Sequence, residues 1–196
     1  MILIVLASTS PTRQAMLRSA GLEFSSTAPQ VDERALVAAH PEWPPADVAL
    51  RLAEAKAEEV SRRHPQSIVI GADQVLALGS RVYSKPRDTA DCRKQLQELR
   101  GQTHLLISAV VCARGGTATW SHVAEARLTM RDFSDDFVEQ YLAKIGSDCT
   151  SSVGGYKIEG LGLQLFEQVD GDHFTILGLP LIPLMNHLRG TEDLLS

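Results

Sequence analysis

The chain has few cysteines and no pattern in which they would bind a metal. It contains Cys92, Cys112 and Cys149, and no two of them form a C-x-x-C pair. An odd number of widely spaced thiols is typical of reduced, mostly buried residues in a cytosolic protein. The sequence therefore predicts a cytoplasmic location, with neither a disulfide framework nor a zinc site.

Basic clusters and long apolar runs are also missing. The net charge is −5, aromatic residues make up 5% of the chain, and lysine and arginine never gather in a block. This composition argues against a nucleic-acid or membrane-surface partner. The apolar run at 2–7 is too short to cross a membrane and has no positively charged segment before it, so it predicts a buried strand rather than a signal peptide. A small ligand in a concave pocket fits better.

Several nucleotide and hydrolase motifs are absent as well. The sequence contains no G-x-x-x-x-G-K-[ST] phosphate loop, no G-x-S-x-G nucleophile elbow and no H-E-x-x-H metal motif among its six histidines. The pair Gly160-x-Gly162 is too short for a dinucleotide fingerprint. The chain therefore lacks the commonest sequence signatures of phosphate-loop enzymes, serine hydrolases and zinc peptidases.

The first 21 residues are the most informative segment present. The apolar run stops at Ser8-Thr9-Ser10-Pro11, and a helical pattern follows. Ser10 suits the N-cap, Pro11 the first helical position and Gly21 the position after the helix. Unpaired backbone N–H groups, serine hydroxyls and Arg13 would then meet where a phosphate can bind. The same pattern also fits an ordinary strand-to-helix turn.

The rest of the chain alternates strands and helices. We expect an extended segment at 22–31, a polar loop after it, strands at 67–70, 75–78, 81–84, 103–113, 117–130 and 163–169, and helices at 47–64, 89–99, 135–145 and 180–189. The first of these strands is expected to end in a loop at 71–74. Alternation of this kind predicts an α/β fold with a mixed sheet. At 196 residues the chain is long enough for one domain with two lobes and a cleft, the second lobe coming from the middle of the chain.

Two residues stand out as candidates for chemistry. Lys56 falls on the apolar stripe of the helix at 47–64, so it needs an acidic partner or a ligand. Asp73 follows the buried strand 67–70, at the carboxyl end where open α/β sheets place their sites. Alternatively, Lys56 reaches solvent from the helix edge or pairs with a buried acid, and Asp73 only caps a turn.

Acids and cations together indicate phosphate chemistry. Asp32, Glu33 and Asp73 supply carboxylates, and Arg13, Lys56 and Lys85 supply cations. Carboxylates hold a hard cation such as Mg²⁺ and orient water, while cations and N–H groups neutralise a polyphosphate. This mixture suits hydrolysis of a phosphoanhydride.

At this point the sequence resembles the Maf-like nucleoside triphosphate pyrophosphatases over nearly its whole length. The matching motifs are L-A-S-T-S-P-T-R (6–13), V-D-E (31–33), L-R-L-A-E-A-K-A (50–57), I-G-A-D-Q (70–74), K-P-R-D (85–88), G-Q-T-H (101–104), G-Y-K-I-E-G-L-G (155–162) and G-L-P-L (178–181). The resemblance implies that residues 1–196 form a single Maf-like domain with two lobes and a central cleft, similar to the inosine triphosphate pyrophosphatases.

The resemblance also implies an activity and a set of residues that carry it. The reaction is metal-dependent cleavage of a nucleoside triphosphate between the α and β phosphates, which gives a nucleoside monophosphate and pyrophosphate. Asp73 is then the catalytic residue, and Glu33 and Asp73 bind Mg²⁺ or Mn²⁺. The phosphate-binding residues would be Ser8, Ser10, Arg13, Lys56 and Lys85.

Three positions bear on the base. Thr12, Gln74 and Glu159 differ from the dTTP and UTP branch of the family, and Gln74 and Glu159 look like the branch that acts on 7-methyl-GTP. The carboxylate of Glu159 can accept hydrogen bonds from the N1–H and N2–H₂ donors of guanine.

A dTTP/UTP pyrophosphatase is the alternative within the family. The alternative that is not an enzyme is a nucleotide-binding regulator of cell division. The complete set of acids and cations favours the enzyme. A nucleoside triphosphate is the expected partner, and a homodimer is left open.

Overall fold

The computed structural model describes residues 3–190, which form two compact units. Of these residues, the first unit contains 3–74, 107–125 and 172–190, and the second contains 75–106 and 126–171. In the described residues one seven-stranded sheet has the order β2-β1-β3-β5-β6-β7, with β4 paired to β3. Its three long strands, β3 (Ile68–Leu78), β5 (Thr103–Arg114) and β6 (Thr117–Met130), contribute to both units.

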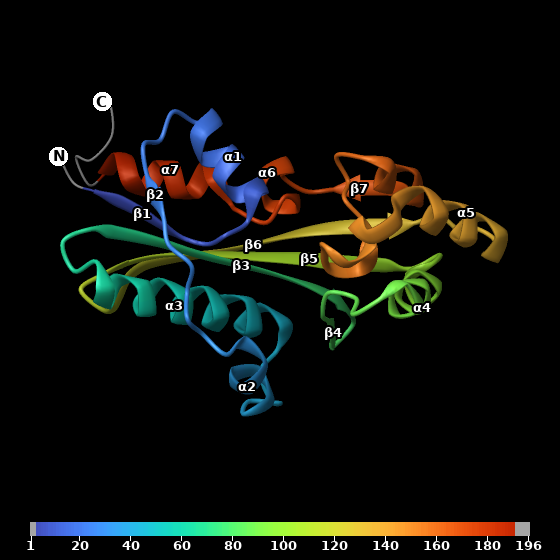
Figure 1. Cartoon of the computed structure of the whole chain (residues 1–196), viewed down its shortest axis with the longest axis horizontal. Coiled ribbons are helices and arrows are strands. Elements are labelled where there is room, and N and C mark those ends of the chain that lie inside the picture. The colour runs from blue at the N-terminus through green and yellow to red at the C-terminus, as the bar shows by residue number, and fades with distance from the viewer. Residues whose placement is uncertain (1–2, 191–196) are drawn as a thin grey trace. The chain divides into compact units, whose positions relative to one another are not determined.

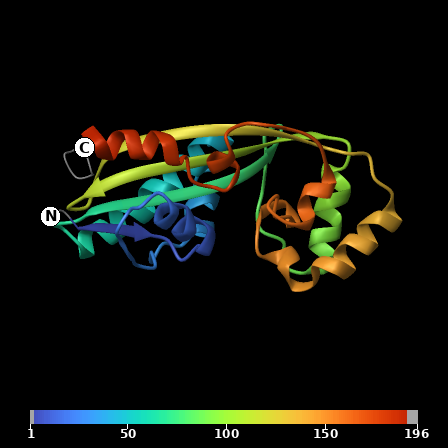
Figure 2. The ribbon, with the colours of Figure 1, turned by 90° about the horizontal axis from the view of Figure 1, so that it is seen from above.

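The first unit is a sheet with helices on both faces (Figure 1). Its other elements are β1 (Ile4–Ala7), α1 (Pro11–Ser19), β2 (Ser25–Ser26), α2 (Glu33–Ala38), α3 (Pro45–Arg63), α6 (His173–Ile176) and α7 (Leu181–Gly190). Strand β1 pairs in parallel with β2 and with β3. Figure 2 shows β1, β3, β5 and β6 as successive strands in this unit.

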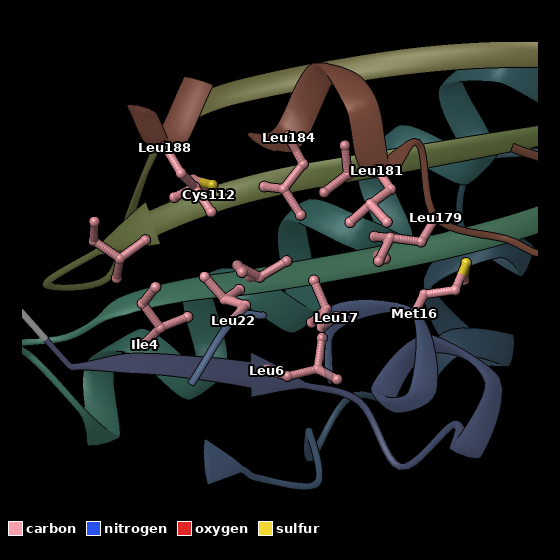
Figure 3. Packing of buried hydrophobic residues seen from close by; sticks show 14 residues of the cluster. Ile4, Leu6, Met16, Leu17, Leu22, Cys112, Leu179, Leu181, Leu184 and Leu188 are labelled. Atoms are coloured by element: carbon pink, nitrogen blue, oxygen red, sulfur yellow. The ribbon is translucent and has the colours of Figure 1, made fainter. Parts of the chain in front are cut away.

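The side chains of β1 divide the core of the first unit in two, because successive residues of a strand point to opposite faces. Ile4 and Leu6 pack with α1 and α7 in a large apolar cluster (Figure 3). Val5 and Ala7 pack with Val60 of α3 on the other face. A strand that is buried on both faces has a continuous apolar sequence, as residues 2–7 have. Of the expected strand, Ile2 lies outside the described residues.

The second unit holds β4 (Arg81–Tyr83), α4 (Thr89–Leu99), α5 (Asp135–Ile145), the 3-10 turns η1 (Gly146–Thr150), η2 (Val153–Gly155) and η3 (Leu161–Leu165), and β7 (Phe166–Asp170). Helix α4 lies beside α5, where Arg93 pairs with Glu139 at 2.8 Å. The Nε2 atom of His104 on β5 is 2.7 Å from the Tyr156 hydroxyl, and Tyr156 packs edge-on against Phe166. None of the described helices is long and apolar enough to span a membrane.

The α/β class and the mixed sheet are confirmed, but four local expectations are wrong. Strand β3 does not stop at 71–74: its first part pairs with β1 and its last part with β4, so the backbone between them stays extended. Asp73 therefore lies within a strand and not at its carboxyl end. The polar loop after 31 contains α2, capped by Asp32, and α6 lies in the segment between the expected strand 163–169 and the expected helix 180–189. Both helices are too short to show a 3.6-residue period. Strand β7 begins at Phe166 because η3 occupies the residues before it.

Candidate active site

Three charged side chains from three elements meet in the first unit. Lys56 of α3 places its Nζ 2.6 Å from Oδ1 of Asp73 on β3 and 2.9 Å from Oε1 of Glu33 on α2. Lys56 and Asp73 are buried, with 6% and 7% of their surface exposed, whereas the Glu33 side chain is about half exposed. The structure thus gives Lys56 the acidic partner that its inward position requires.

A glycine allows the lysine and the aspartate to approach. Gly71 lies two residues before Asp73 and touches α3, where an added Cβ would collide with the backbone oxygen of Ala53 and lie 2.7 Å from the Cβ and the N of Ala57. Strand and helix can be this close only because Gly71 has no side chain and the facing residues are alanines. One turn of α3 therefore presents Lys56 directly to Asp73.

Burial raises the pKa of Asp73 above its ordinary value, while the charges of Lys56 and Arg13 act in the opposite direction. A raised pKa makes a carboxylate a better proton acceptor near neutral pH, so Asp73 has the character of a general base. A buried carboxylate with a perturbed pKa beside a specific charged partner is the pattern expected of a functional site.

The start of α1 supplies the predicted anion-binding groups in the same unit. Ser10 caps α1 by accepting a hydrogen bond from the backbone N of Arg13 at 3.4 Å. Ser8 is buried, and its Oγ accepts from the backbone N of Ser10 at 3.2 Å. Strand β1 ends at Ala7, opposite Gly71 of β3. The carboxyl end of β1, rather than that of β3, therefore carries the predicted strand-end site.

The Arg13 guanidinium is held from two sides. Its Nε donates to the carbonyl of Gly178 at 2.9 Å, and its Nη1 makes a longer contact of 3.5 Å with Ser8 Oγ. Burial lowers the pKa of Arg13, and the charges of Asp73 and Glu33 raise it. Because an arginine keeps its proton throughout the physiological range, Arg13 is a fixed positive charge near both acids.

The predicted specificity residues belong to different units. Gln74 on β3 is in the first unit and bonds to Ser108 and to the backbone of Thr175 and Ile176, while Thr12 is half-buried on α1. Glu159 is exposed in the second unit, as is the predicted phosphate-binding Lys85. Within the first unit, the structure brings Lys56 together with Asp73 and Glu33, and Arg13 together with Ser8.

Sequence reasoning missed Ser108, Thr175 and the carbonyl of Gly178. Ser108 and Thr175 are buried polar residues inside apolar segments, and Gly178 appears in the sequence only as part of G-L-P-L. A buried serine in the apolar strand 103–113 was the available signal, because a buried hydroxyl needs a partner.

The two carboxylates also bear on a metal ion. Among residues 3–190 no group of three or more histidine, cysteine or acidic side chains is placed to hold one. Asp73 and Glu33 nevertheless offer oxygen ligands on either side of Lys56. Mg²⁺ is usually bound by one or two carboxylates together with waters and substrate phosphates, so this pair fits a cation that arrives with a phosphorylated substrate.

Two solved structures resemble the chain weakly. A HAM1 protein from Coxiella burnetii covers 68% of this chain and 75% of its own, with 15% identity and a TM-score of 0.46. A nucleoside-triphosphatase described as a dITP/XTP pyrophosphatase, from Mycobacterium abscessus, gives a TM-score of 0.44 with 15% identity, over 97% and 95% of the two chains. These TM-scores are too low to support a conclusion about function.

The similarity to curated proteins is much stronger. A 7-methyl-GTP pyrophosphatase from Brucella abortus is 51% identical over 95% of this chain and 94% of its own. One from Rhizobium meliloti is 49% identical over 95% of each. A nucleoside triphosphate pyrophosphatase from Rhodopseudomonas palustris is 48% identical over 95% and 92%. The family model described as Maf-like protein matches residues 3–191, a span that contains every residue of the site above. The chain belongs to the Maf-like protein family.

Proposed function

We propose that this chain is a nucleoside triphosphate pyrophosphatase that converts 7-methyl-GTP to the monophosphate and pyrophosphate. The observation that carries the proposal is the buried Lys56 Nζ between Asp73 and Glu33, at 2.6 and 2.9 Å. The names of the relatives that are about 50% identical support the reaction. Residues 1–196 then form one Maf-like domain whose lobes are the two units.

The site residues of the first unit each have a role in this reaction. Asp73 accepts a proton from water as the water oxygen bonds to phosphorus and the P–O bond between the α and β phosphates breaks. Pyrophosphate leaves, and Lys56 balances the changing charge on Asp73. Arg13, the hydroxyls of Ser8 and Ser10 and the N-terminus of α1 bind the phosphate oxygens.

The proposal includes a divalent cation and a base contact. Mg²⁺ or Mn²⁺, when bound by Asp73 and Glu33, would neutralise phosphate charge. Lys85 binds phosphate, and Glu159 accepts from the N1–H and N2–H₂ donors of guanine. Its charge also favours the cationic ring of 7-methylguanine, and Thr12 completes the specificity set. The cytoplasm is the compartment we propose, because all three cysteines are buried free thiols.

Pyrophosphate release tests the proposal. The kcat/KM values for 7-methyl-GTP, GTP, UTP and dTTP are measured with Mg²⁺, with Mn²⁺ and with a chelator. We expect 7-methyl-GTP to be the best substrate and the chelator to abolish release. Glu159→Gln should move the preference toward pyrimidines, because an amide can both donate to a carbonyl and accept from N3–H. Highest activity on UTP or dTTP would assign the chain to the pyrimidine branch, and no release from any triphosphate would favour the regulatory role.

A further inference from the structure

The side-chain amide of Gln74 is saturated with protein acceptors. Its Nε2 lies 3.1 Å from Ser108 Oγ, 3.1 Å from the Thr175 carbonyl and 2.9 Å from the Ile176 carbonyl. Because two of these partners are carbonyls that can only accept, the amide must point its nitrogen toward them. An amide nitrogen has two hydrogens to donate, and three acceptors already surround it. Gln74 therefore has no donor left for a nucleobase.

The residues that Gln74 holds begin a short strap, defined here as residues 175–178, which includes the last two residues of α6 and the start of the connection to α7. Ser108 Oγ donates to the same Thr175 carbonyl at 2.8 Å, and both residues are almost fully buried, at 0% and 2% exposure. Asp172 caps α6 by accepting from the Thr175 N at 2.8 Å. The beginning of the strap is thus fixed to β3, to β5 and to its own cap.

The other end of the strap orients Arg13. Gly178 adopts a φ of 92°, which favours glycine, and its carbonyl accepts from Arg13 Nε at 2.9 Å. A Cβ added at Gly178 would lie 3.4 Å from Gln74 Oε1 and 3.6 Å from Arg13 Nη2. The oxygen of the Gln74 amide and the Arg13 guanidinium therefore both lie beside the α-carbon of Gly178.

We propose that Gln74 is a positioning residue for Arg13. Through the strap, Gln74 affects the binding of the triphosphate and not the recognition of the base. This inference rests on the proposed function, in which Arg13 binds phosphate. The amide nitrogen fixes the beginning of the strap, and the carbonyl of Gly178 at its end orients the guanidinium. The effect of Gln74 should then be equal for every nucleoside triphosphate.

A probe without a base tests this inference. Calorimetry measures the binding of inorganic tripolyphosphate to the wild type and to Gln74→Leu, which keeps the apolar bulk but loses the amide. We expect at least about tenfold weaker binding, since small displacements of a positioned group cost one to two orders of magnitude. The kcat/KM values for 7-methyl-GTP, GTP and UTP should fall by the same factor.

Two further variants make the result specific. Ser108→Ala removes one of the hydrogen bonds to the Thr175 carbonyl and should cause a smaller loss of tripolyphosphate affinity. This variant also tests the inference if Gln74→Leu does not fold. Ser61→Ala removes another fully buried hydroxyl of the first unit, one that accepts from the Gly116 N at 2.8 Å, and should leave tripolyphosphate binding unchanged. In an Arg13→Ala background Gln74→Leu should cause no further loss, because the group that it positions is gone.

The outcomes separate the inference from the proposed function. Unchanged tripolyphosphate affinity in Gln74→Leu and Ser108→Ala, or a loss that differs between 7-methyl-GTP and UTP, would overturn the positioning role and make Gln74 a base-reading residue. A wild-type chain that binds tripolyphosphate but releases no pyrophosphate would overturn the proposed function alone. A wild-type chain that does neither would overturn both.

Discussion

Asp73 is the residue at which catalysis can be stopped with the least change to the fold. We expect Asp73→Asn to lower kcat about 10²- to 10⁴-fold, the range for loss of a general acid or base, because an amide cannot accept the proton from water. Asparagine has the same shape, and Lys56 keeps Glu33 at 2.9 Å, so the fold should persist. Pyrophosphate release measures the loss, and tripolyphosphate binding and thermal unfolding check the folded state.

Asp32→Asn is the matched control at this scale. Asp32 neighbours Glu33 in the chain and caps α2 by accepting from the Ala35 N at 3.0 Å, a task that asparagine performs equally well. Its kcat should stay near the wild-type value. Near wild-type turnover in Asp73→Asn would refute the role of Asp73 as the base.

At the scale of elements, the contact between β3 and α3 determines whether Lys56 reaches Asp73. Gly71→Ala inserts a methyl group where Ala53 and Ala57 leave no room. We expect a loss of about 1–3 kcal/mol in unfolding free energy, as for other overpacked cores, because α3 must move away from the strand. Activity should fall as well, since the same movement separates the ion pair.

Urea unfolding and kcat/KM, measured on the same preparation, test both effects. Gly190→Ala serves as the control, because among residues 3–190 no atom apart from its chain neighbours and its own helix backbone lies within 4 Å of its added Cβ. Its unfolding free energy should change by less than about 0.5 kcal/mol. Wild-type stability and activity in Gly71→Ala would show that α3 and β3 are not held in this close contact.

At the scale of the whole molecule, the two units should respond differently to acid. Burial lowers the pKa of His104 in the second unit from 6.5 to about 4, so the folded protein keeps this imidazole neutral. Between pH 6.5 and pH 4 the unfolded chain binds a proton on His104 that the folded chain does not bind. The stability contribution of the neutral His104 is therefore complete above pH 6.5 and is lost as the pH falls toward 4. The loss is about 3 kcal/mol at pH 4.

Comparing wild type with His104→Phe isolates this contribution from the other titrating groups. The fall in unfolding free energy from pH 7 to pH 4 should be about 3 kcal/mol smaller in the variant. Hydrogen exchange should show that the amides of α4 lose protection in acid before those of β1. Equal acid sensitivity in wild type and variant would contradict a neutral, buried His104.

The sequence by itself determined the elements with a long period or a clear cap. The helix at 89–99 and the hairpin that turns at Gly115 and Gly116 follow from local chemistry, because periodicity, capping residues and turn glycines act over a few residues. The same local rules found Ser10 as a cap and marked Lys56 as a cation in need of a partner.

Only the tertiary structure decided which partner each residue has. Lys56 is 17 residues from Asp73 in the chain, and Gln74 is 102 residues from the Ile176 carbonyl that it holds. No local pattern encodes these distances, because they depend on where β1 pairs with β3 and on how closely α3 can approach Gly71. For the same reason the sequence could not identify the partners of the Gln74 amide, which the fold places against Ser108 and the carbonyls of Thr175 and Ile176. Local chemistry acts through neighbouring residues, whereas a site is made by burying distant ones together.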